Sequence, residues 1–482
     1  MKLFILAVLV AVALQDQSGL PELKDIAERA YVYAYPLVLL EATRAGQPVN
    51  QFIHVPQFPR PDTRKVIRPN ADTLYSMAWI DVSSEPILIR VPDSGGRFYL
   101  LQFMDAWTET FADPGKRTTG TAEAWFAVVG PGWKGKLPGG VTRYDSPTNF
   151  VWLLGRTQTN GAADYDNVHA FQKGMRIMPL SGYPDAEQKL GSALAFGTSG
   201  DVTPPERVKA MEPVEFFAEF CRAMKANPPH AGDAAMIRDL ARIGIVPGED
   251  FDAAKLSPEQ LQAVKEGAQA AAARIEGIAG RANQDKSGWS TFIRNVGRYG
   301  TDYISRAITA RLAIGANPPE DAVYTSAFAD SAGQALNGSM RYRMHFDKGQ
   351  LPSVRAFWSL TAYDKDGYFI ANAIHRYAIG DRDPLKFNPD GSLDLYIQAQ
   401  IPGAERESNW LPSGDGQSDH SALLAGRSHP EGNLAASGGR TDAVSAVRNS
   451  TIKGWEAEKR ALRAPAEKEW RGRRDSNSRP LP

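Results

Sequence analysis

Residues 97–103 read RFYLLQF, a short apolar and aromatic run that directly follows the turn sequence DSGG. Similar runs occupy residues 86–91, 124–129 and 150–154, and glycine, proline and aspartate separate them. Short runs rich in β-branched and aromatic residues, bounded by turn residues, are typical of β-strands. We therefore expect an antiparallel β-sheet in this part of the chain.

After this sheet the pattern becomes helical, and strands then return. Apolar side chains recur every three or four residues over 20–43 and again over 213–282, which is the period of a helix packed on one face. Residues 340–346 instead alternate apolar and polar side chains, and residues 354–363 are apolar on both faces. Such strands with little helix between them favour a β-sandwich. We predict an α+β, β-rich fold with an N-terminal antiparallel β domain, a helical connecting layer and a C-terminal β-sandwich.

The N-terminal end predicts export. In residues 1–18 a lysine precedes a run of about 12 apolar residues, and Ala-Val-Ala at 11–13 within this run supplies the small residues that a signal peptidase accepts. A membrane anchor would need roughly 20 apolar residues. We therefore expect a secretory signal peptide and a periplasmic or secreted protein without a transmembrane segment after cleavage.

The C-terminal end differs from the rest of the chain in composition. Residues 413–482 contain two aromatic residues and twelve Lys or Arg. Such a stretch cannot bury enough apolar surface to offset its chain entropy, which predicts a disordered tail. The expected division is therefore a signal peptide at 1–18, an N-terminal β-rich domain at 19–185, a helical connecting region at 186–310, a C-terminal β-sandwich at 311–412 and the tail.

Charge and motif content exclude several classes of function. The 482 residues include 55 Lys or Arg and 55 Asp or Glu, so the net charge does not attract nucleic acid. The single cysteine, Cys221, excludes an intrachain disulfide. The sequence has no phosphate-binding loop, nucleophile elbow or zinc motif. We expect no metal and no cofactor. A polar envelope ligand is the expected partner. The sequence leaves open whether the protein forms a homo-oligomer.

Six motifs carry a resemblance to a known family. They are RPNADTLYS at 68–76, LGRT at 154–157, YGTDY at 299–303, AFWSLT at 356–361, RYAIGDR at 376–382 and NWLP at 409–412. In this order they resemble bacterial exported proteins catalogued as domains of unknown function 1254 and 1214. The resemblance implies an N-terminal β-rich domain, a helical connection and a C-terminal jelly-roll-like domain. It implies no reaction.

The chain departs from the family pattern at two places. His375 stands where the family motif commonly has asparagine. After Pro412, the family's further apolar strand and its Tyr-Trp-Pro-like segment do not appear. We therefore hypothesise a frameshift or recombination junction shortly after Pro412, which would leave a truncated sandwich with an exposed sheet edge. Genomic reads that show an uninterrupted frame in close relatives with the same tail would reject this hypothesis.

The densest polar cluster is expected where a loop enters the first strong strand. It consists of Arg68, Asn70, Asp72, Thr73 and Tyr75. An arginine beside carboxylate and amide side chains can orient a ligand, and an ionised Asp72 can act as a base. Alternatively, Asn70 and Asp72 only fix the geometry of a turn while Arg68 pairs with Asp72.

A second set of candidates follows the run at 97–103. Asp105 and Glu109 add carboxylates, and Trp107 offers a stacking surface. Two carboxylates that flank a sugar bond are the usual equipment of glycoside hydrolysis. We therefore expect Asp72 and Asp105 to be catalytic. The residues expected to bind ligand are Arg68, Asn70, Tyr75, Trp107, Arg156 and Arg376.

Two functions are compatible with these residues. The leading hypothesis is an exported envelope protein that binds and hydrolyses a glycan or a related polar envelope component between its β-rich domains. The alternative is a noncatalytic protein of surface adhesion or envelope assembly that uses the same sandwich faces. Turnover of cell-wall and glycan substrates distinguishes the two.

Overall fold

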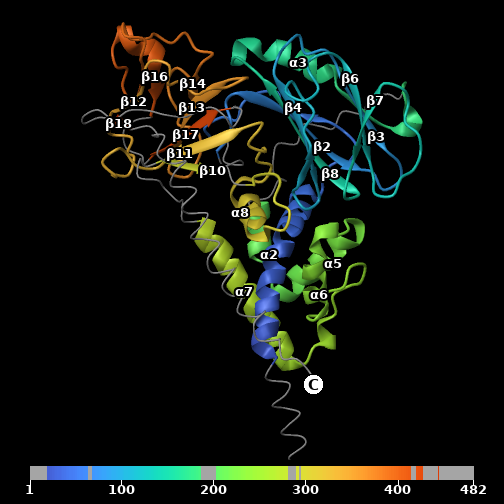
Figure 1. Cartoon of the computed structure of the whole chain (residues 1–482). Coiled ribbons are helices and arrows are strands. Elements are labelled where there is room, and N and C mark those ends of the chain that lie inside the picture. The colour runs from blue at the N-terminus through green and yellow to red at the C-terminus, as the bar shows by residue number, and fades with distance from the viewer. Residues whose placement is uncertain are drawn as a thin grey trace, which may run out of the picture.

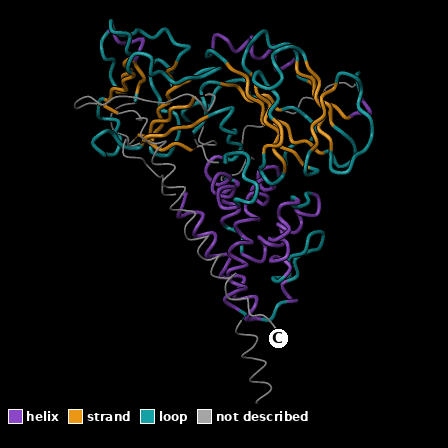
Figure 2. The backbone as a smooth tube through the Cα atoms, in the orientation of Figure 1, coloured by secondary structure: helices purple, strands orange, loops and turns teal. Residues whose placement is uncertain are grey.

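A computed structural model describes residues 19–62, 68–185, 202–279, 289–292, 295–413, 420–426 and 443–444. It has two β-rich parts above a layer of helices (Figure 1, Figure 2). Among the described residues, no helix has the length and apolar character that crossing a bilayer requires. The predicted signal peptide lies outside the described residues.

The N-terminal β part consists of two packed sheets. The first sheet has the order β1 (Ile53–His54), β2 (Thr73–Asp81), β8 (Phe150–Gln158), β4 (Tyr99–Asp105) and β5 (Thr110–Ala112). The second has the order β7 (Val141–Asp145), β6 (Ala124–Val129), β3 (Ile87–Val91) and β9 (Arg176–Pro179). All neighbouring strands are antiparallel except β6 and β7. Apolar side chains from both sheets, including Leu101, Phe103, Ile89 and Val128, form one core, which confirms the predicted β-rich domain.

The centre of the first sheet is tightly packed at Gly155 of the LGRT motif. A Cβ atom at this position would lie 2.6 Å from the backbone oxygen of Ser76 on β2. It would also lie 2.9 Å from a methyl carbon of Leu101 on β4. Only glycine therefore fits where β8 passes between its two neighbours.

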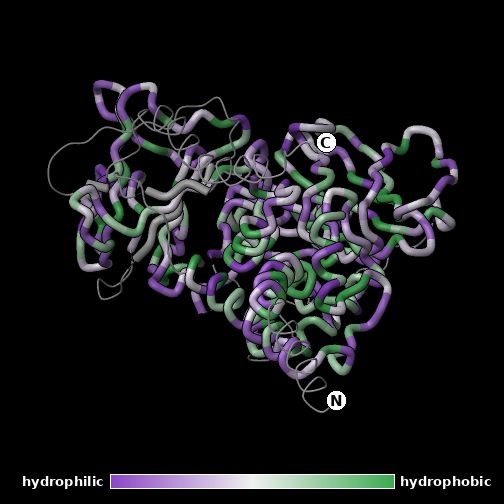
Figure 3. The backbone as a smooth tube through the Cα atoms, turned by 60° about the horizontal axis from the view of Figure 1, so that its bottom comes forward, coloured by the Kyte–Doolittle hydropathy of each residue, from purple (hydrophilic) through white to green (hydrophobic). Residues whose placement is uncertain are grey.

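The helical layer gathers segments that are far apart in the sequence. Its helices are α2 (Leu20–Arg44), α4 (Pro204–Lys209), α5 (Pro213–Ala226), α6 (Ala234–Ala241), α7 (Pro258–Ala279) and α8 (Tyr303–Ala313). Figure 1 shows α2 at the centre of this layer, although its sequence precedes the N-terminal β part. Hydrophobic and hydrophilic stretches alternate along these helices in Figure 3, as expected for amphipathic helices that share a core.

Helix α2 continues through Pro36, although a proline inside a helix usually bends or ends it. Every residue from Ala30 to Leu40 is buried, so packing on all sides stabilises the helix against the cost of the proline. At Gly267 of α7 a Cβ atom would lie 2.2 Å from the backbone oxygen of Lys24. This glycine allows α7 to approach α2 closely.

The C-terminal part is a β-sandwich, as predicted. One sheet has the order β10 (Trp289–Phe292), β11 (Val323–Ala327), β17 (His420–Gly426), β13 (Trp358–Asp364) and β14 (Ala378–Gly380). The other has the order β16 (Trp410–Pro412), β15 (Leu393–Gln398), β12 (Tyr342–Phe346) and β18 (Ala443–Val444). The core between the sheets includes Trp358 and Leu360 from one side and Met344, Phe346 and Leu395 from the other.

One further helix, α3 (Tyr165–Gly174), does not belong to the helical layer and lies at the top of the N-terminal β part (Figure 1).

Strand β17 corrects the predicted end of the sandwich at residue 412. It lies between β11 and β13 and pairs antiparallel with both, so that Ala422 is opposite Ala327 and Ala362. The prediction missed this strand because its apolar run, Ala-Leu-Leu-Ala, is short and stands in a polar stretch. Most of the predicted tail lies outside the described residues.

Candidate functional site

The motif at 68–76 forms a joint between the two β parts. The side-chain oxygen of Asn70 accepts hydrogen bonds from the backbone N–H groups of Asp72 at 2.9 Å and Thr73 at 2.7 Å. This interaction fixes the turn that leads into β2, as the alternative interpretation expects. The carboxylate of Asp72 is buried, accepts a 2.7 Å hydrogen bond from the Ser359 hydroxyl and forms an ion pair with Arg382. Asp72 therefore ties the N-terminal sheet to the C-terminal sandwich.

The partner of Asp72 is Arg382, so the predicted pairing of Asp72 with Arg68 is wrong. Arg382 also donates a 2.7 Å hydrogen bond to the backbone oxygen of Thr159, and its guanidinium lies 4.3 Å from the centre of the Phe357 ring. The Arg68 backbone has a positive φ of 52°, and its guanidinium lies 5.4 Å from the ring centre of Phe328. The turn directs Arg68 to the C-terminal part and leaves Arg382 to neutralise Asp72.

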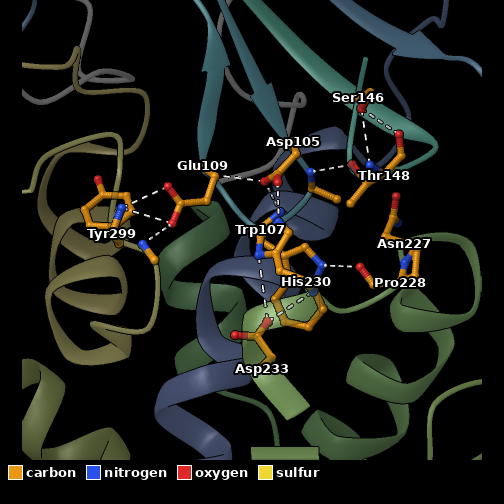
Figure 4. Close-up of polar contacts among 12 residues, drawn as sticks. Asp105, Trp107, Glu109, Ser146, Thr148, Asn227, Pro228, His230, Asp233 and Tyr299 are labelled. Atoms are coloured by element: carbon orange, nitrogen blue, oxygen red, sulfur yellow. Dashed lines mark hydrogen bonds and ion pairs between the residues drawn. The ribbon is translucent and has the colours of Figure 1, made fainter. Parts of the chain in front are cut away.

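Asp105 belongs to a second joint, between β4 and the helical layer (Figure 4). Its side chain is fully buried. One carboxylate oxygen accepts hydrogen bonds from the backbone N–H groups of Trp107 at 2.9 Å and Glu109 at 3.0 Å. The other oxygen lies 2.5 Å from Nε2 of His230 in the segment that leads to α6. Asp105 therefore shapes the turn after β4 and anchors it to the helices.

His230 lies between two carboxylates. Its Nδ1 atom is 3.7 Å from Asp233, which also accepts 2.9 Å hydrogen bonds from the hydroxyl groups of Tyr33 on α2 and Tyr303 on α8. Burial by itself lowers the pKa of His230, but the hydrogen bond to Asp105 and the negative charges of Asp105 and Asp233 outweigh burial and raise it. The imidazolium form is therefore favoured. We refer to Asp105, His230 and Asp233 as the histidine clasp.

Glu109 extends this joint towards α8. Its carboxylate accepts a hydrogen bond from the backbone N–H of Tyr299 at 2.8 Å and one from that of Gly300 at 2.6 Å. It also forms a 2.9 Å ion pair with Arg306, whose side chain is fully buried. The Nε and Nη1 atoms of Arg306 have no hydrogen-bond partner among the described residues. Glu109 therefore joins the β4–β5 turn to the YGTDY motif.

Trp107 does not offer the predicted stacking surface. Its ring is fully buried and its Nε1 donates a 3.1 Å hydrogen bond to the backbone oxygen of Pro228. The ring centre lies 4.8 Å from that of Tyr33. The prediction treated the loop after β4 as exposed, whereas the helical layer covers it. Trp107 is therefore part of the buried core of the joint.

Arg156 anchors a loop against the first sheet. It is buried and donates hydrogen bonds to the Asn317 side chain at 2.7 Å and the Gly315 backbone oxygen at 2.9 Å, both in the loop after α8. It also donates a 3.1 Å hydrogen bond to Gln102 on β4, and its guanidinium lies 5.4 Å from the ring centre of Tyr75. The two predicted ligand residues, Arg156 and Tyr75, are thus brought together, but Arg156 is occupied by structural partners.

Arg376 lies in the C-terminal part, away from the clasp. Its guanidinium donates 2.9 Å hydrogen bonds to the backbone oxygens of Glu407 and Trp410. These bonds attach the RYAIGDR motif to the NWLP motif. The neighbouring residue, His375, is exposed and has a φ of 51°, a conformation in which both asparagine and histidine are enriched.

The two predicted catalytic carboxylates do not converge. Thr73, next to Asp72, pairs with Gln158 on β8, and Asp105 pairs with Val151 on the same strand. At about 3.3 Å per residue, this register separates the two ends by more than about 20 Å. The carboxylates of glycoside hydrolases are about 5–10 Å apart. The expected catalytic pair is therefore contradicted, because each carboxylate belongs to a different end of the sheet.

Comparison with known families and structures agrees with this architecture. Models described as "Protein of unknown function (DUF1254)" and "Protein of unknown function (DUF1214)" match residues 49–179 and 321–424. The chain carries both of these domains, in that order. The DUF1254 domain is the N-terminal β part, and the DUF1214 match extends into β17, beyond the residue at which the resemblance was expected to end.

Two solved structures are similar to the chain. The VPA0106 protein from Vibrio parahaemolyticus is 25% identical with a TM-score of 0.65, and the match covers 88% of this chain and 100% of that protein. This likeness supports the α+β, β-rich fold. An uncharacterised protein from Burkholderia cenocepacia is 12% identical with a TM-score of 0.41, over 84% of this chain and 86% of that protein. No curated protein matches the chain.

Several residues of the two joints were missed from the sequence. Ser359 and Arg382 stand inside the AFWSLT and RYAIGDR motifs, and Tyr299 and Tyr303 stand inside YGTDY. At the Asp72 joint, motifs of the DUF1254 and DUF1214 domains therefore meet, and the motifs were the available signal for these residues. His230 and Asp233 belong to none of the six motifs, so their pairing could not be read from the sequence.

The histidine clasp predicts a pH dependence of stability. Because the pKa of folded His230 lies above the unfolded value of about 6.5, its contribution is complete below that pH and is lost as the pH rises through the folded pKa. Half-buried His54 acts in the opposite direction, because desolvation lowers its pKa to about 4, so its contribution is lost as the pH falls from about 6.5 towards that value. We expect stability to be highest near pH 6–7 and to decline on both sides of this maximum.

Urea unfolding at a series of pH values measures this dependence. In the His230→Gln variant, the decline above pH 7 should become shallower, while the decline below pH 6 should persist. In His54→Gln, the acid side should change and the alkaline side should not. An unchanged alkaline profile in His230→Gln would contradict the assignment of the clasp.

Proposed function

We propose that the protein is an exported, noncatalytic binding protein of the cell envelope that presents a surface built jointly by its DUF1254 and DUF1214 domains. The observation that carries this proposal is the Asp72 joint. Asp72, Ser359 and Arg382 bind one domain to the other through buried, charge-assisted contacts. Side chains on either side of the joint thus keep fixed positions, and a preorganised surface binds a ligand at low entropic cost.

The carboxylates of Asp72 and Asp105 are already bonded to other groups of the protein, which supports binding over hydrolysis. Asp72 is held by Arg382 and Ser359, and Asp105 is held by His230 and two backbone N–H groups. Each of them stabilises a contact between parts of the fold. Envelope assembly through a protein partner is a variant of the same proposal, and copurification of a stoichiometric partner would identify it.

A hydrolase is the second candidate, favoured by the pair of Asp105 and His230. A buried carboxylate that orients a histidine is an arrangement used in acid–base catalysis. The His230 side chain is 21% exposed, so solvent reaches it. The second carboxylate, Asp233, favours the imidazolium form, however, and an imidazolium cannot accept a proton.

Binding and turnover assays on the same material separate the two candidates. Protein beginning at residue 19 is incubated with purified peptidoglycan and with outer-membrane polysaccharide, and both the bound fraction and the release of soluble sugar are measured. We expect binding without sugar release, and the same binding by Asp105→Asn. Sugar release that disappears in a folded His230→Gln variant would instead establish the hydrolase, and absence of binding to both materials would reject the proposal.

A further inference from the structure

A group of aromatic and imidazole side chains lies where the DUF1254 and DUF1214 domains adjoin. We call it the seam surface and define it as Phe58, Tyr165, His169, His375 and Tyr377. Figure 1 shows α3, which carries Tyr165 and His169, on the side of its domain that faces β14. His375 is exposed and the other four side chains are half-buried.

On the DUF1254 side, three rings are fixed to one another. The ring centres of Phe58 and Tyr165 are 5.6 Å apart in an edge-to-face arrangement, and those of Tyr165 and His169 are 6.0 Å apart. The Tyr165 hydroxyl accepts a 3.1 Å hydrogen bond from the backbone N–H of Phe58. His169 lies 2.7 Å from the backbone oxygen of Pro56. These contacts hold the rings in a defined orientation without burying them completely.

On the DUF1214 side, a column of three stacked rings leads from the core to the surface. Tyr363 is buried and stacks on Phe369 at 5.8 Å, and Phe369 stacks on Tyr377 at 4.8 Å. The Tyr377 hydroxyl lies 3.4 Å from Nδ1 of the exposed His375. The neighbouring Ile374 is 43% exposed. The outermost ring is therefore rigidly supported from below.

The two sides act on each other electrostatically. Burial raises the pKa of the Tyr165 phenol, and the Tyr377 phenol across the seam adds to this shift. Burial also raises the pKa of Tyr377, which senses the charges of Arg60 and Asp62 in the loop after β1. This agrees with their placement in the fold, because α3, which begins at Tyr165, and β14, which directly follows Tyr377, lie on the facing sides of the two domains (Figure 1).

Several charged groups near these rings are paired. Arg60 and Asp62 are 3.6 Å apart, and Asp164, which precedes α3, forms a 2.6 Å ion pair with Arg97. Arg376 is bonded to two backbone oxygens. A charged ligand would have to compete with these pairs, whereas an uncharged ligand would not.

We propose that the seam surface binds an uncharged glycan chain, with Tyr165 and Tyr377 as platforms for sugar rings and with His169 and His375 at their polar edges. A sugar ring has an apolar C–H face and a rim of hydroxyl groups. Tyrosine and histidine likewise combine an apolar ring with a polar tip. This inference rests on the proposed binding function and names its site and ligand class.

Calorimetric titration with uncharged hexasaccharides tests the proposal. The probes are hexamers of N-acetylglucosamine, of β-1,4-linked glucose and of α-1,4-linked glucose, and polygalacturonate serves as an anionic counterpart. We expect the full chain to bind at least one hexamer more tightly than polygalacturonate. The Tyr165→Ala/Tyr377→Ala variant should bind that hexamer at least about tenfold more weakly, because it loses both central aromatic contacts.

Two further variants control for folding and for the chemistry of the rings. Tyr165→Phe/Tyr377→Phe keeps both rings and should stay within about threefold of the parent affinity. Met340→Ser removes a side chain that is 53% exposed before β12 in the other sheet, and it should bind like the parent. Thermal unfolding of each variant verifies that it is folded.

The proposal is overturned if no hexamer binds, if the double alanine variant binds as well as the parent, or if polygalacturonate binds more tightly. Failure here is distinguishable from failure of the proposed function. Peptidoglycan binding that persists in the double alanine variant would leave the binding function in place and reject only the seam surface. Absence of binding to peptidoglycan, outer-membrane polysaccharide and every hexamer would reject both.

Discussion

Replacing Asp105 with alanine is expected to lower the free energy of unfolding by about 3–5 kcal/mol. The carboxylate is fully buried and accepts hydrogen bonds from the N–H groups of Trp107 and Glu109, and it forms an ion pair with His230. Without it, two backbone donors and a charged imidazole stay in the interior without their partner. Urea unfolding near pH 6.5, where His230 is protonated, should give the largest effect.

Matched variants separate this effect from the general cost of removing a charge. Asp145→Ala removes an aspartate of the same β part that is 68% exposed and paired with Arg143, and it should cost less than about 1 kcal/mol. His230→Gln in the Asp105→Ala background should add little, because the ion pair is already broken. If the two alanine variants lose the same small amount, Asp105 is not the anchor of the joint.

The strands of both β parts were predictable because their signals are local. The run at 97–103 became β4 at Tyr99–Asp105, and the alternating residues at 340–346 became β12 at Tyr342–Phe346. In each case the apolar pattern of a few neighbouring residues decides which face is buried. The local signal was too weak for β17, whose place in the sheet is set by pairing with β11 and β13, strands far from it in the sequence.

The chemistry of the joints could not be predicted, because it depends on pairs far apart in sequence. Ser359 and Arg382 are separated from Asp72 by 287 and 310 positions. The polar pattern around Asp72 and Asp105 predicted catalysis, whereas both carboxylates are buried and bonded to other parts of the fold. They could not indicate whether a ligand or another part of the fold supplies the partners. A polar residue buried at a domain joint and one in a binding site leave the same pattern in a sequence.

The same ambiguity explains the misplaced Trp107. A tryptophan flanked by carboxylates after a strand suggests an exposed loop that stacks on a ligand. In the fold, α2 and the segment before α6 cover this loop, and Tyr33 and Pro228 become the partners of the ring. The rings of the seam surface were not singled out from the sequence, because Tyr165 and Tyr377 become neighbours only when the two domains are joined.

Replacing Asp72 with alanine is expected to uncouple the two domains and to destabilise the fold by about 3–5 kcal/mol. The Asp72 side chain is only 6% exposed, and its loss would leave the guanidinium of Arg382 against the Phe357 ring without a counter-charge. The Ser359 hydroxyl would also lose its acceptor. Because the joint connects two separate cores, urea unfolding should change from one transition to two, with the DUF1214 sandwich unfolding first.

Removing both charges distinguishes an electrostatic joint from simple packing. In Asp72→Ala/Arg382→Met no buried charge is left alone, so this variant should be more stable than Asp72→Ala although it lacks one more native side chain. Asp366→Ala is the matched control, because this aspartate of the same sandwich is 49% exposed beside Lys365 and should leave a single transition. The joint also positions Tyr165 relative to Tyr377, so Asp72→Ala should weaken glycan binding without altering either ring. If Asp72→Ala unfolds in one transition at the parent's urea midpoint, the two domains are held together by contacts other than this ion pair.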